Sequence, residues 1–445
     1  MRRTTDDLGA LLGVSLLTRR RLIQGLVTVL APTALIGEAR STGTPQKSSA
    51  TIATDVPYSP TVLSPGIRSR FVNNINGLRM HVLEAGFEVK DRPCVLLLHG
   101  FPELAYSWRK VMLPIASAGF HVIAPDRRGY GRTSGWDVGY YDDLDPFGTL
   151  NQVRDTLGLV SAFGYRSVAA VIGHDAGSPI AAWCSVVRPD IFRSVVMMSA
   201  PFAGPPTLPF NTADAAQANA EADATVDRIY EELAALKPPR KHYQRYYATR
   251  EANDNMWHAP QGVHDFMRAY YHMKSADWKQ NVPLPLKART ASEWAKLPRY
   301  YVMDLNKGMA ETVAPEMPSA AGIAVCKWLP DDELKVYSTE YGRTGFQGGL
   351  EGYRLMWIGK YAAELQMFSG RTINVPSLFI GGKSDWGVYQ NPGALEKMQK
   401  TACTRMLGTH FVDGAGHWVQ QEQPEQVSQL LLKFLHDKAQ RENGP

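Results

Sequence analysis

One stretch, Ser167–Trp183, constrains the fold of this chain more than any other, because it combines a buried strand, a sharp turn and a helix start. Val168 to Ile172 is an unbroken apolar run, as expected of a strand that is covered on both faces in a parallel sheet. The run leads into Gly173-His-Asp-Ala-Gly177, in which a glycine stands two residues before and two residues after Asp175. Glycine tolerates crowding that a Cβ would prevent, and Pro179 suits the first turn of a helix. We therefore expect Asp175 at the tip of a sheet, above a helix N-terminus.

The turn fits the G-x-nucleophile-x-G pattern of a nucleophile elbow, with Asp175 where a lipase or esterase has serine. A carboxylate is already ionised near neutral pH, so it can attack an sp3 carbon without the help of a base. The product is an alkyl ester on the enzyme. Water activated by a histidine must then attack the carbonyl carbon of Asp175 itself. A helix-capping role for Asp175 would not explain both glycines.

Composition is that of a globular protein with a large core. The chain has 445 residues, of which 44% are hydrophobic and 20% charged. The net charge is +5 without a basic run beyond the N-terminus, so we expect no nucleic-acid site. Cys94 and Cys184 lie in apolar segments and are predicted to be buried thiols. His258, His264 and His272 lack the i, i+4 spacing of a helical zinc site, so no metal is expected.

The N-terminus has the features of an export signal. Thr18-Arg-Arg-Arg-Leu-Ile-Gln24 is similar to the twin-arginine motif, and a short apolar stretch follows from Gly25 to Gly37. The resemblance implies that residues 1–39 direct export of the folded protein to the periplasm or beyond, with cleavage after Ala39. If the segment is instead a frayed or interfacial helix, a cytoplasmic protein is expected. Residues 40–65 are rich in Ser, Thr and Pro and are predicted to form a linker. The mature chain is expected to have no membrane span.

Apolar runs and helical periodicity alternate along two parts of the chain. Strands are predicted at 78–83, 93–98, 120–124, 168–172, 194–198, 375–380 and 406–412, and helices at 103–117, 150–163 and 422–437. This alternation specifies an α/β fold with a mostly parallel, twisted sheet between helices. It stops between 202 and 370, where helix formers and aromatic residues dominate. We therefore expect a core domain made of 66–201 and 371–445, with 202–370 inserted as a helical lid that excludes water.

Two further motifs resemble the epoxide hydrolase and dehalogenase branch of the α/β-hydrolase superfamily. His99-Gly-Phe-Pro102 follows the second predicted strand, and Pro125-Asp-Arg-Arg-Gly-Tyr-Gly-Arg-Thr-Ser134 follows the third. The resemblance implies that the first is an oxyanion-hole loop, in which the N–H of Phe101 works together with that of Ala176. It implies a structural role for the second motif, including Asp126.

The same resemblance assigns an acid and a base near the C-terminus. Asp385 follows the strand predicted to end at Ile380, and His417 follows the strand predicted at 406–412. The chain order Asp175, Asp385, His417 is the superfamily order of nucleophile, acid and base. Asp385 is then expected to hold the imidazole tautomer of His417 and to stabilise its cation.

Two segments of the expected lid are similar to those that hold the catalytic tyrosines of soluble epoxide hydrolases. Lys241-His-Tyr-Gln-Arg-Tyr-Tyr247 matches the first, and Tyr246 aligns best, with Tyr243 and Tyr247 left open as alternatives. Thr344–Arg354 matches the second segment, and Tyr353 aligns with its catalytic tyrosine. Opening an epoxide develops an alkoxide, which a neutral phenol with a pKa near 10 can protonate. Tyr300 and Tyr301 are further competitors for the first position.

The resemblance covers residues 66–437 and implies a cofactor-independent epoxide hydrolase that forms a vicinal diol from a small apolar epoxide. Phe101, Trp108 and Trp386 are expected as pocket aromatics. The alternatives are a haloalkane or haloacid dehalogenase of the same fold and a ligand-binding protein without turnover. Relatives commonly carry Trp directly after the nucleophile, which contacts the leaving halide in haloalkane dehalogenases. Ala176 stands at that position here and disfavours dehalogenation.

Overall fold

The computed structural model describes residues 56–137, 139–208, 225–359 and 362–442. The predicted export signal and residues 40–55 of the predicted linker lie outside them. The rest of the predicted linker packs onto the core, because Tyr58 and Leu63 are buried in the same apolar cluster as Ile67. The folded core therefore begins before Gly66.

Eight strands form one twisted sheet in the order β1-β2-β4-β3-β5-β6-β9-β10. Their bounds are β1 Ile67–Ile75, β2 Leu78–Ala85, β3 Cys94–Leu98, β4 His121–Pro125, β5 Ala170–His174, β6 Val195–Met198, β9 Ser377–Gly382 and β10 Met406–Val412. β2 pairs antiparallel with β1 and with β4, and the strands from β4 to β10 pair in parallel. The predicted α/β fold with a mostly parallel sheet is thus confirmed.

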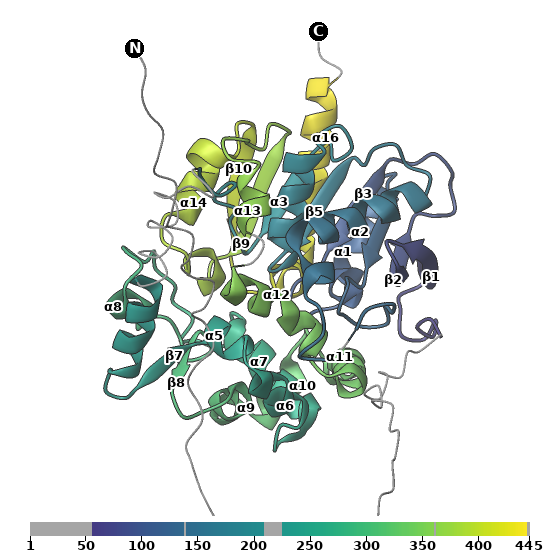
Figure 1. Cartoon of the computed structure of the whole chain (residues 1–445). Coiled ribbons are helices and arrows are strands. Elements are labelled where there is room, and N and C mark those ends of the chain that lie inside the picture. The colour runs from purple at the N-terminus through teal and green to yellow at the C-terminus, as the bar shows by residue number, and fades with distance from the viewer. Residues whose placement is uncertain (1–55, 138, 209–224, 360–361, 443–445) are drawn as a thin grey trace, which may run out of the picture. The chain divides into compact units, whose positions relative to one another are not determined.

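Helices cover both faces of this sheet (Figure 1). α1 (Arg109–Ser117) and α16 (Pro424–Glu442) pack together on one face, and α2 (Thr149–Ala162) and α3 (Gly177–Val187) pack together on the other. Successive β3 residues alternate between the two faces: Val95 joins the cluster that contains α1, and Leu96 joins the cluster that contains α3. Burial on both sides explains why the central strands are apolar throughout.

The segment between β6 and β9 is helical and is called the helical insertion here (described residues 225–359 and 362–366). Its helices include α5 Tyr243–Tyr247, α6 Arg250–Trp257, α7 Gly262–Lys274, α8 Ala291–Trp294, α9 Met309–Val313, α10 Ala320–Val325, α11 Asp331–Thr344, α12 Gln347–Ile358 and α13 Ala362–Gln366. The short strands β7 (Arg240–His242) and β8 (Val302–Asp304) pair antiparallel within it. Figure 1 shows α5 to α11 grouped together below the sheet. No helix in the described part of the chain is both long and apolar enough to cross a membrane.

Buried hydroxyl groups join the helical insertion to the core. Tyr271 of α7 donates a hydrogen bond to the carbonyl of Pro102 (3.0 Å), and Tyr341 of α11 donates to the carbonyl of Glu103 (3.1 Å). Tyr337 shares a 2.9 Å hydrogen bond with Ser107. The insertion therefore fixes the loop after β3.

Candidate active site

Asp175 lies on a sharp turn between β5 and α3, where its φ is +48°, in the left-handed region that side chains rarely adopt. Its N–H donates to the carbonyl of Met198 at the end of β6 (3.1 Å). A Cβ on Gly173 would collide with the carbonyl oxygen of Gly177, and a Cβ on Gly177 would collide with that of Leu98. Both glycines of the motif are therefore required by close backbone contacts.

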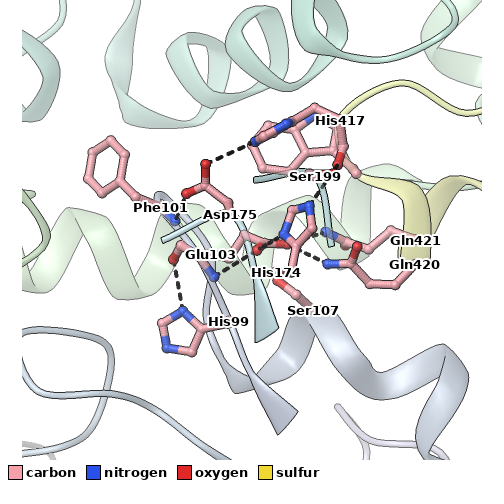
Figure 2. Close-up of polar contacts among 12 residues, drawn as sticks. His99, Phe101, Glu103, Ser107, His174, Asp175, Ser199, His417, Gln420 and Gln421 are labelled. Atoms are coloured by element: carbon pink, nitrogen blue, oxygen red, sulfur yellow. Dashed lines mark hydrogen bonds and ion pairs between the residues drawn. The ribbon is translucent and has the colours of Figure 1, made fainter. Parts of the chain in front are cut away.

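The two oxygens of the Asp175 carboxylate face different groups (Figure 2). Oδ1 accepts a hydrogen bond from the N–H of Phe101 (2.9 Å), and Oδ2 lies 3.3 Å from Nε2 of His417. A Cβ on Gly100 would collide with the side chain of Asp175, so glycine permits this approach of the loop after β3. The Phe101–Pro102 peptide bond is cis. Ala176, the second predicted N–H donor, directly precedes the first residue of α3.

His417 lies between two carboxylates. Its Nδ1 is 3.0 Å from Oδ1 of Asp385, which also accepts the N–H of Gly387 (2.7 Å). A carboxylate oxygen can only accept, so Nδ1 carries a proton and Nε2 is directed at Asp175. His417 and Asp385 are 2% and 1% exposed. The structure therefore brings together the three residues that sequence assigns as nucleophile, base and acid.

The surroundings of these carboxyl groups favour their ionised forms. Burial raises the pKa of Asp175, but the contact with His417 and the positive charges of Lys274 and His174 outweigh burial, so its pKa lies well below the usual range. Burial also raises the pKa of Asp385, and His417 together with the Gly387 N–H brings it below the ordinary value. Both groups are thus carboxylates at neutral pH.

A buried ion pair, Glu103 and His174, lies below Asp175 and His417 in the view of Figure 2. His174 Nδ1 is 2.6 Å from Oε2 of Glu103, and its Nε2 is 2.7 Å from the carbonyl oxygen of His417. Both partners are acceptors, so both nitrogens donate and His174 is an imidazolium. Burial lowers the pKa of His174, and the Glu103 charge more than reverses this; burial raises the pKa of Glu103, and His174 brings it below its ordinary value. Glu103 also accepts from the N–H of Gly100 (2.9 Å) and from Gln420 (2.9 Å).

His99 supports the same loop as a neutral side chain. Its Nδ1 lies 2.9 Å from the Gly100 carbonyl, and its Nε2 accepts the N–H of Arg127 (3.1 Å). Burial and the positive charge of Arg127 lower the pKa of His99 to about 4. Asp126 accepts from His81 (2.7 Å) and from the N–H of Ala105 (2.8 Å), so its contacts belong to the scaffold.

The structure brings Tyr353 and Tyr243 together, and the charge of Asp175 acts on both. Tyr353 of α12 lies with its ring centroid 5.8 Å from that of Phe101 and 5.8 Å from that of Tyr243. Burial raises the pKa of Tyr353 well above 10, and Tyr243 and Asp175 raise it further. Burial and then Asp175 likewise raise the pKa of Tyr243. Both phenols therefore remain protonated.

Tyr246, which aligned best by sequence, is not brought to Asp175. The ammonium of Lys241 lies 4.5 Å from the centre of its ring. Burial raises its pKa, and the other groups that act on it are the backbone of Met309, Glu311 and Glu251. Neighbouring positions of a helix point about 100° apart, and the α5 side chain on which the charge of Asp175 acts is that of Tyr243, whose hydroxyl donates to Oε1 of Gln390 (3.3 Å). Tyr247 contacts Phe101 as well, with ring centroids 5.5 Å apart.

The two predicted pocket tryptophans occupy different places. Trp386 begins the 3₁₀ helix η4 (Trp386–Val388) directly after Asp385 and is 5% exposed. Trp108 ends the 3₁₀ helix η1 (Ala105–Trp108) and is fully buried in the core. The rings that contact Phe101, beside the nucleophile, are those of Tyr247, Phe346 and Tyr353.

Lys274 is a buried cation that sequence reasoning missed. It ends α7, is 3% exposed, and its ammonium lies 5.2–5.3 Å from the ring centres of Tyr270, Tyr301 and Trp418. Its charge lowers the pKa of Asp175. No signal in the sequence marked it, because only the fold brings the end of α7 beside the elbow.

Among the residues that the structure describes, no group of three or more His, Cys, Asp or Glu side chains is arranged to hold a metal ion. The four cysteines are free thiols, and Cys94 and Cys184 are buried. The ionised carboxylate, the N–H donor and the imidazole supply what nucleophilic catalysis with an ester intermediate requires.

Comparison with known proteins gives consistent results. Residues 93–272 match the family described as alpha/beta hydrolase fold. The chain is 30% identical to epoxide hydrolase B of Mycobacterium tuberculosis over 372 residues, which cover 81% of this chain and 96% of that protein. It is also 30% identical to an epoxide hydrolase of Caballeronia sordidicola over 365 residues, which cover 81% and 91%.

Solved structures are similar over the same region. An epoxide hydrolase from an endophytic Streptomyces superposes with a TM-score of 0.66 at 28% identity, covering 84% of this chain and 96% of that one. Epoxide hydrolase I of potato, Solanum tuberosum, superposes with a TM-score of 0.62 at 27% identity, covering 83% and 99%. The similarity therefore includes the sheet and the helical insertion.

Proposed function

Because this chain belongs to the epoxide hydrolases of the α/β-hydrolase superfamily, we propose that it converts an apolar epoxide into a vicinal diol without a cofactor. One observation carries the proposal: Oδ1 of Asp175 accepts the Phe101 N–H while Oδ2 faces His417. This arrangement leaves one carboxylate oxygen to attack a carbon and holds the other where an oxyanion will form.

The first half of the reaction is alkylation of Asp175. Oδ2 attacks an epoxide carbon, a carbon–oxygen bond forms, and the ring bond to that carbon breaks with its electron pair passing to the ring oxygen. A phenol proton from Tyr353 or Tyr243 neutralises the developing alkoxide. Both phenols are protonated, and the charge of Asp175 acts on both. The product is an alkyl ester that carries a free hydroxyl group.

The second half is hydrolysis of that ester. Nε2 of His417 takes a proton from water, and the hydroxide attacks Cγ of Asp175. The N–H groups of Phe101 and Ala176 bind the oxyanion, and Asp385 stabilises the imidazolium. The bond between Cγ and the alkyl oxygen then breaks, and the leaving alkoxide takes the proton from His417. The new carboxyl group of Asp175 loses the proton that arrived with the attacking hydroxide, and the tyrosinate left by the first half regains one, which restores both groups. Asp175, His417 and Asp385 thus act as a catalytic triad, and the helical insertion acts as the lid that keeps bulk water out.

A single turnover in heavy-oxygen water tests this mechanism. The solvent oxygen ends in the Asp175 carboxylate, and both oxygens of the first diol come from the epoxide and from the original carboxylate. We expect the label in the peptide that contains Asp175 and none in the first diol, as read by mass spectrometry. An Asp175→Ala variant should form no diol. Solvent label in the first diol would exclude the ester route.

Dehalogenation by the same nucleophile is the second candidate, and one residue decides against it. Ala176 offers no side-chain donor to a leaving halide, whereas the oxyanion site needs only its backbone N–H. Halide release from haloalkanes without diol formation from epoxides would reverse this choice. An intact protein that binds an epoxide stoichiometrically without releasing diol would instead favour a binding function.

A further inference from the structure

The loop that carries the base His417 is bound to the end of α7 in the helical insertion. The N–H of His417 donates to the carbonyl of Lys274 (2.8 Å). The indole N–H of Trp418 donates to the carbonyl of Tyr271 (2.9 Å). A Cβ on Gly416 would meet the Lys274 carbonyl oxygen at 2.5 Å, so the two segments are in close contact. The position of the base therefore depends on this contact between the His417 loop of the core and the end of α7 in the insertion, which is called the joint here.

The side chain of Glu422 closes this joint. Glu422 ends α15 (Val419–Glu422) and is buried. Its Oε2 accepts the N–H of Gly416 (2.9 Å) and that of Ala276 (2.8 Å), and its Oε1 accepts the N–H of Trp418 (2.9 Å). One carboxyl group thus holds both chain neighbours of His417 and, across the joint, the segment that follows α7.

Glu422 has no place in the nucleophile site itself. It lines a cavity of about 800 Å³ together with His272 and Asp277, and none of Asp175, Asp385 and His417 lines that cavity. Burial raises the pKa of Glu422 to about 8, and its three N–H donors act in the opposite direction. A proton on Oε1 would leave Oε2 able to accept from Gly416 and Ala276, so the joint holds in either state.

We propose that Glu422 is a positioning residue for ester hydrolysis: it holds the His417 backbone against the end of α7, and so directs Nε2 at the water that attacks Asp175. The inference rests on the proposed function. The proposed role of Glu422 affects hydrolysis and not alkylation. Alkylation depends on Asp175, the Phe101 loop and the tyrosines, whereas only hydrolysis needs His417 as a base. A displacement of about 1 Å in a catalytic group can reduce a rate about 100-fold.

The decisive variant is Glu422→Gln, which keeps the shape of the side chain. Its amide oxygen can replace one carboxylate oxygen as an acceptor. Its NH₂ group then stands in the place of the other carboxylate oxygen and cannot accept the N–H that this oxygen accepted. We expect ester hydrolysis to slow by at least about tenfold, while alkylation stays within about threefold of wild type. Glu422→Leu, which satisfies none of the three N–H groups, should slow hydrolysis further. Glu425→Gln, an exposed glutamate in the first turn of α16, is the matched control and should behave as wild type.

Rapid-quench kinetics with intact-protein mass spectrometry measures both steps, because the ester adds the mass of the epoxide to the chain. Accumulation of ester in Glu422→Gln supports the inference. Hydrolysis at the wild-type rate, or an equal loss in both steps, overturns it. Failure of wild type to form any ester would overturn the proposed function and this inference together, whereas normal wild-type behaviour with a normal Glu422→Gln variant overturns only the inference.

Discussion

At the scale of single residues, the first tyrosine of the insertion is where sequence and structure differ most. Helix α5 has only five residues, and three of them are tyrosines. A motif alignment has nothing in so short a helix to fix its rotation. The structure gives Tyr243 the ring contact with Tyr353 and the influence of Asp175, and gives Tyr246 the ammonium of Lys241. These neighbours favour Tyr243 over the expected Tyr246 as the first proton donor.

Tyr243→Phe and Tyr246→Phe form a matched pair that tests this assignment. Losing one of two proton donors should reduce the alkylation rate of Tyr243→Phe by about 10- to 100-fold, because Tyr353 remains. Tyr246→Phe should stay within about twofold, since its hydroxyl lies among groups outside the site. Pre-steady-state measurement of ester formation gives both rates. The opposite ranking would return the donor role to Tyr246.

At the scale of elements, the central strands and the edge strand β10 were predictable, and the other edge strand, β1, was not. β3, β5 and β9 are apolar runs because helices cover both of their faces, and burial of that kind is visible in sequence. β1 was missed because Ile67–Ile75 is an edge strand with mostly polar, partly exposed residues. The Glu103–His174 pair could not be predicted from the sequence either, because its two residues are 71 positions apart and only the sheet brings them together.

The loop after β3 illustrates how closely two elements approach at the site. Gly100→Ala would place a Cβ against the side chain of Asp175. We expect the nucleophile to shift and the rate of alkylation to fall by at least about 100-fold, in a protein whose circular dichroism is unchanged. Gly342→Ala in α11 is the control: a Cβ there meets nothing within 4 Å, so it should retain activity and gain about 0.5–1 kcal/mol of stability. Equal activity of the two variants would contradict this account of the loop.

At the scale of the whole molecule, the buried Glu103–His174 pair connects the loop after β3, the elbow and the base loop. The His174 pKa is raised, so the stability that its charge provides is fully present below the unfolded value of about 6.5 and is lost as pH rises through the folded value. The Glu103 pKa is lowered, so its contribution is present above about 4.3 and is lost as pH falls through the folded value. The pair therefore stabilises the fold most between about pH 4.3 and 6.5.

Urea unfolding of wild type and His174→Gln at pH values from 5 to 9 measures this contribution. Removing one partner of a buried pair typically costs about 3–5 kcal/mol, and we expect the full difference near pH 5.5. Above pH 6.5 the wild-type advantage should shrink by up to about 1.4 kcal/mol per pH unit, until the folded-state pKa of His174 is passed. His410→Gln, at an exposed position of β10, is the control for the loss of a histidine. Parallel stability curves for wild type and His174→Gln would mean that His174 is neutral, and the positive charge behind Asp175 would then have to come from Lys274 alone.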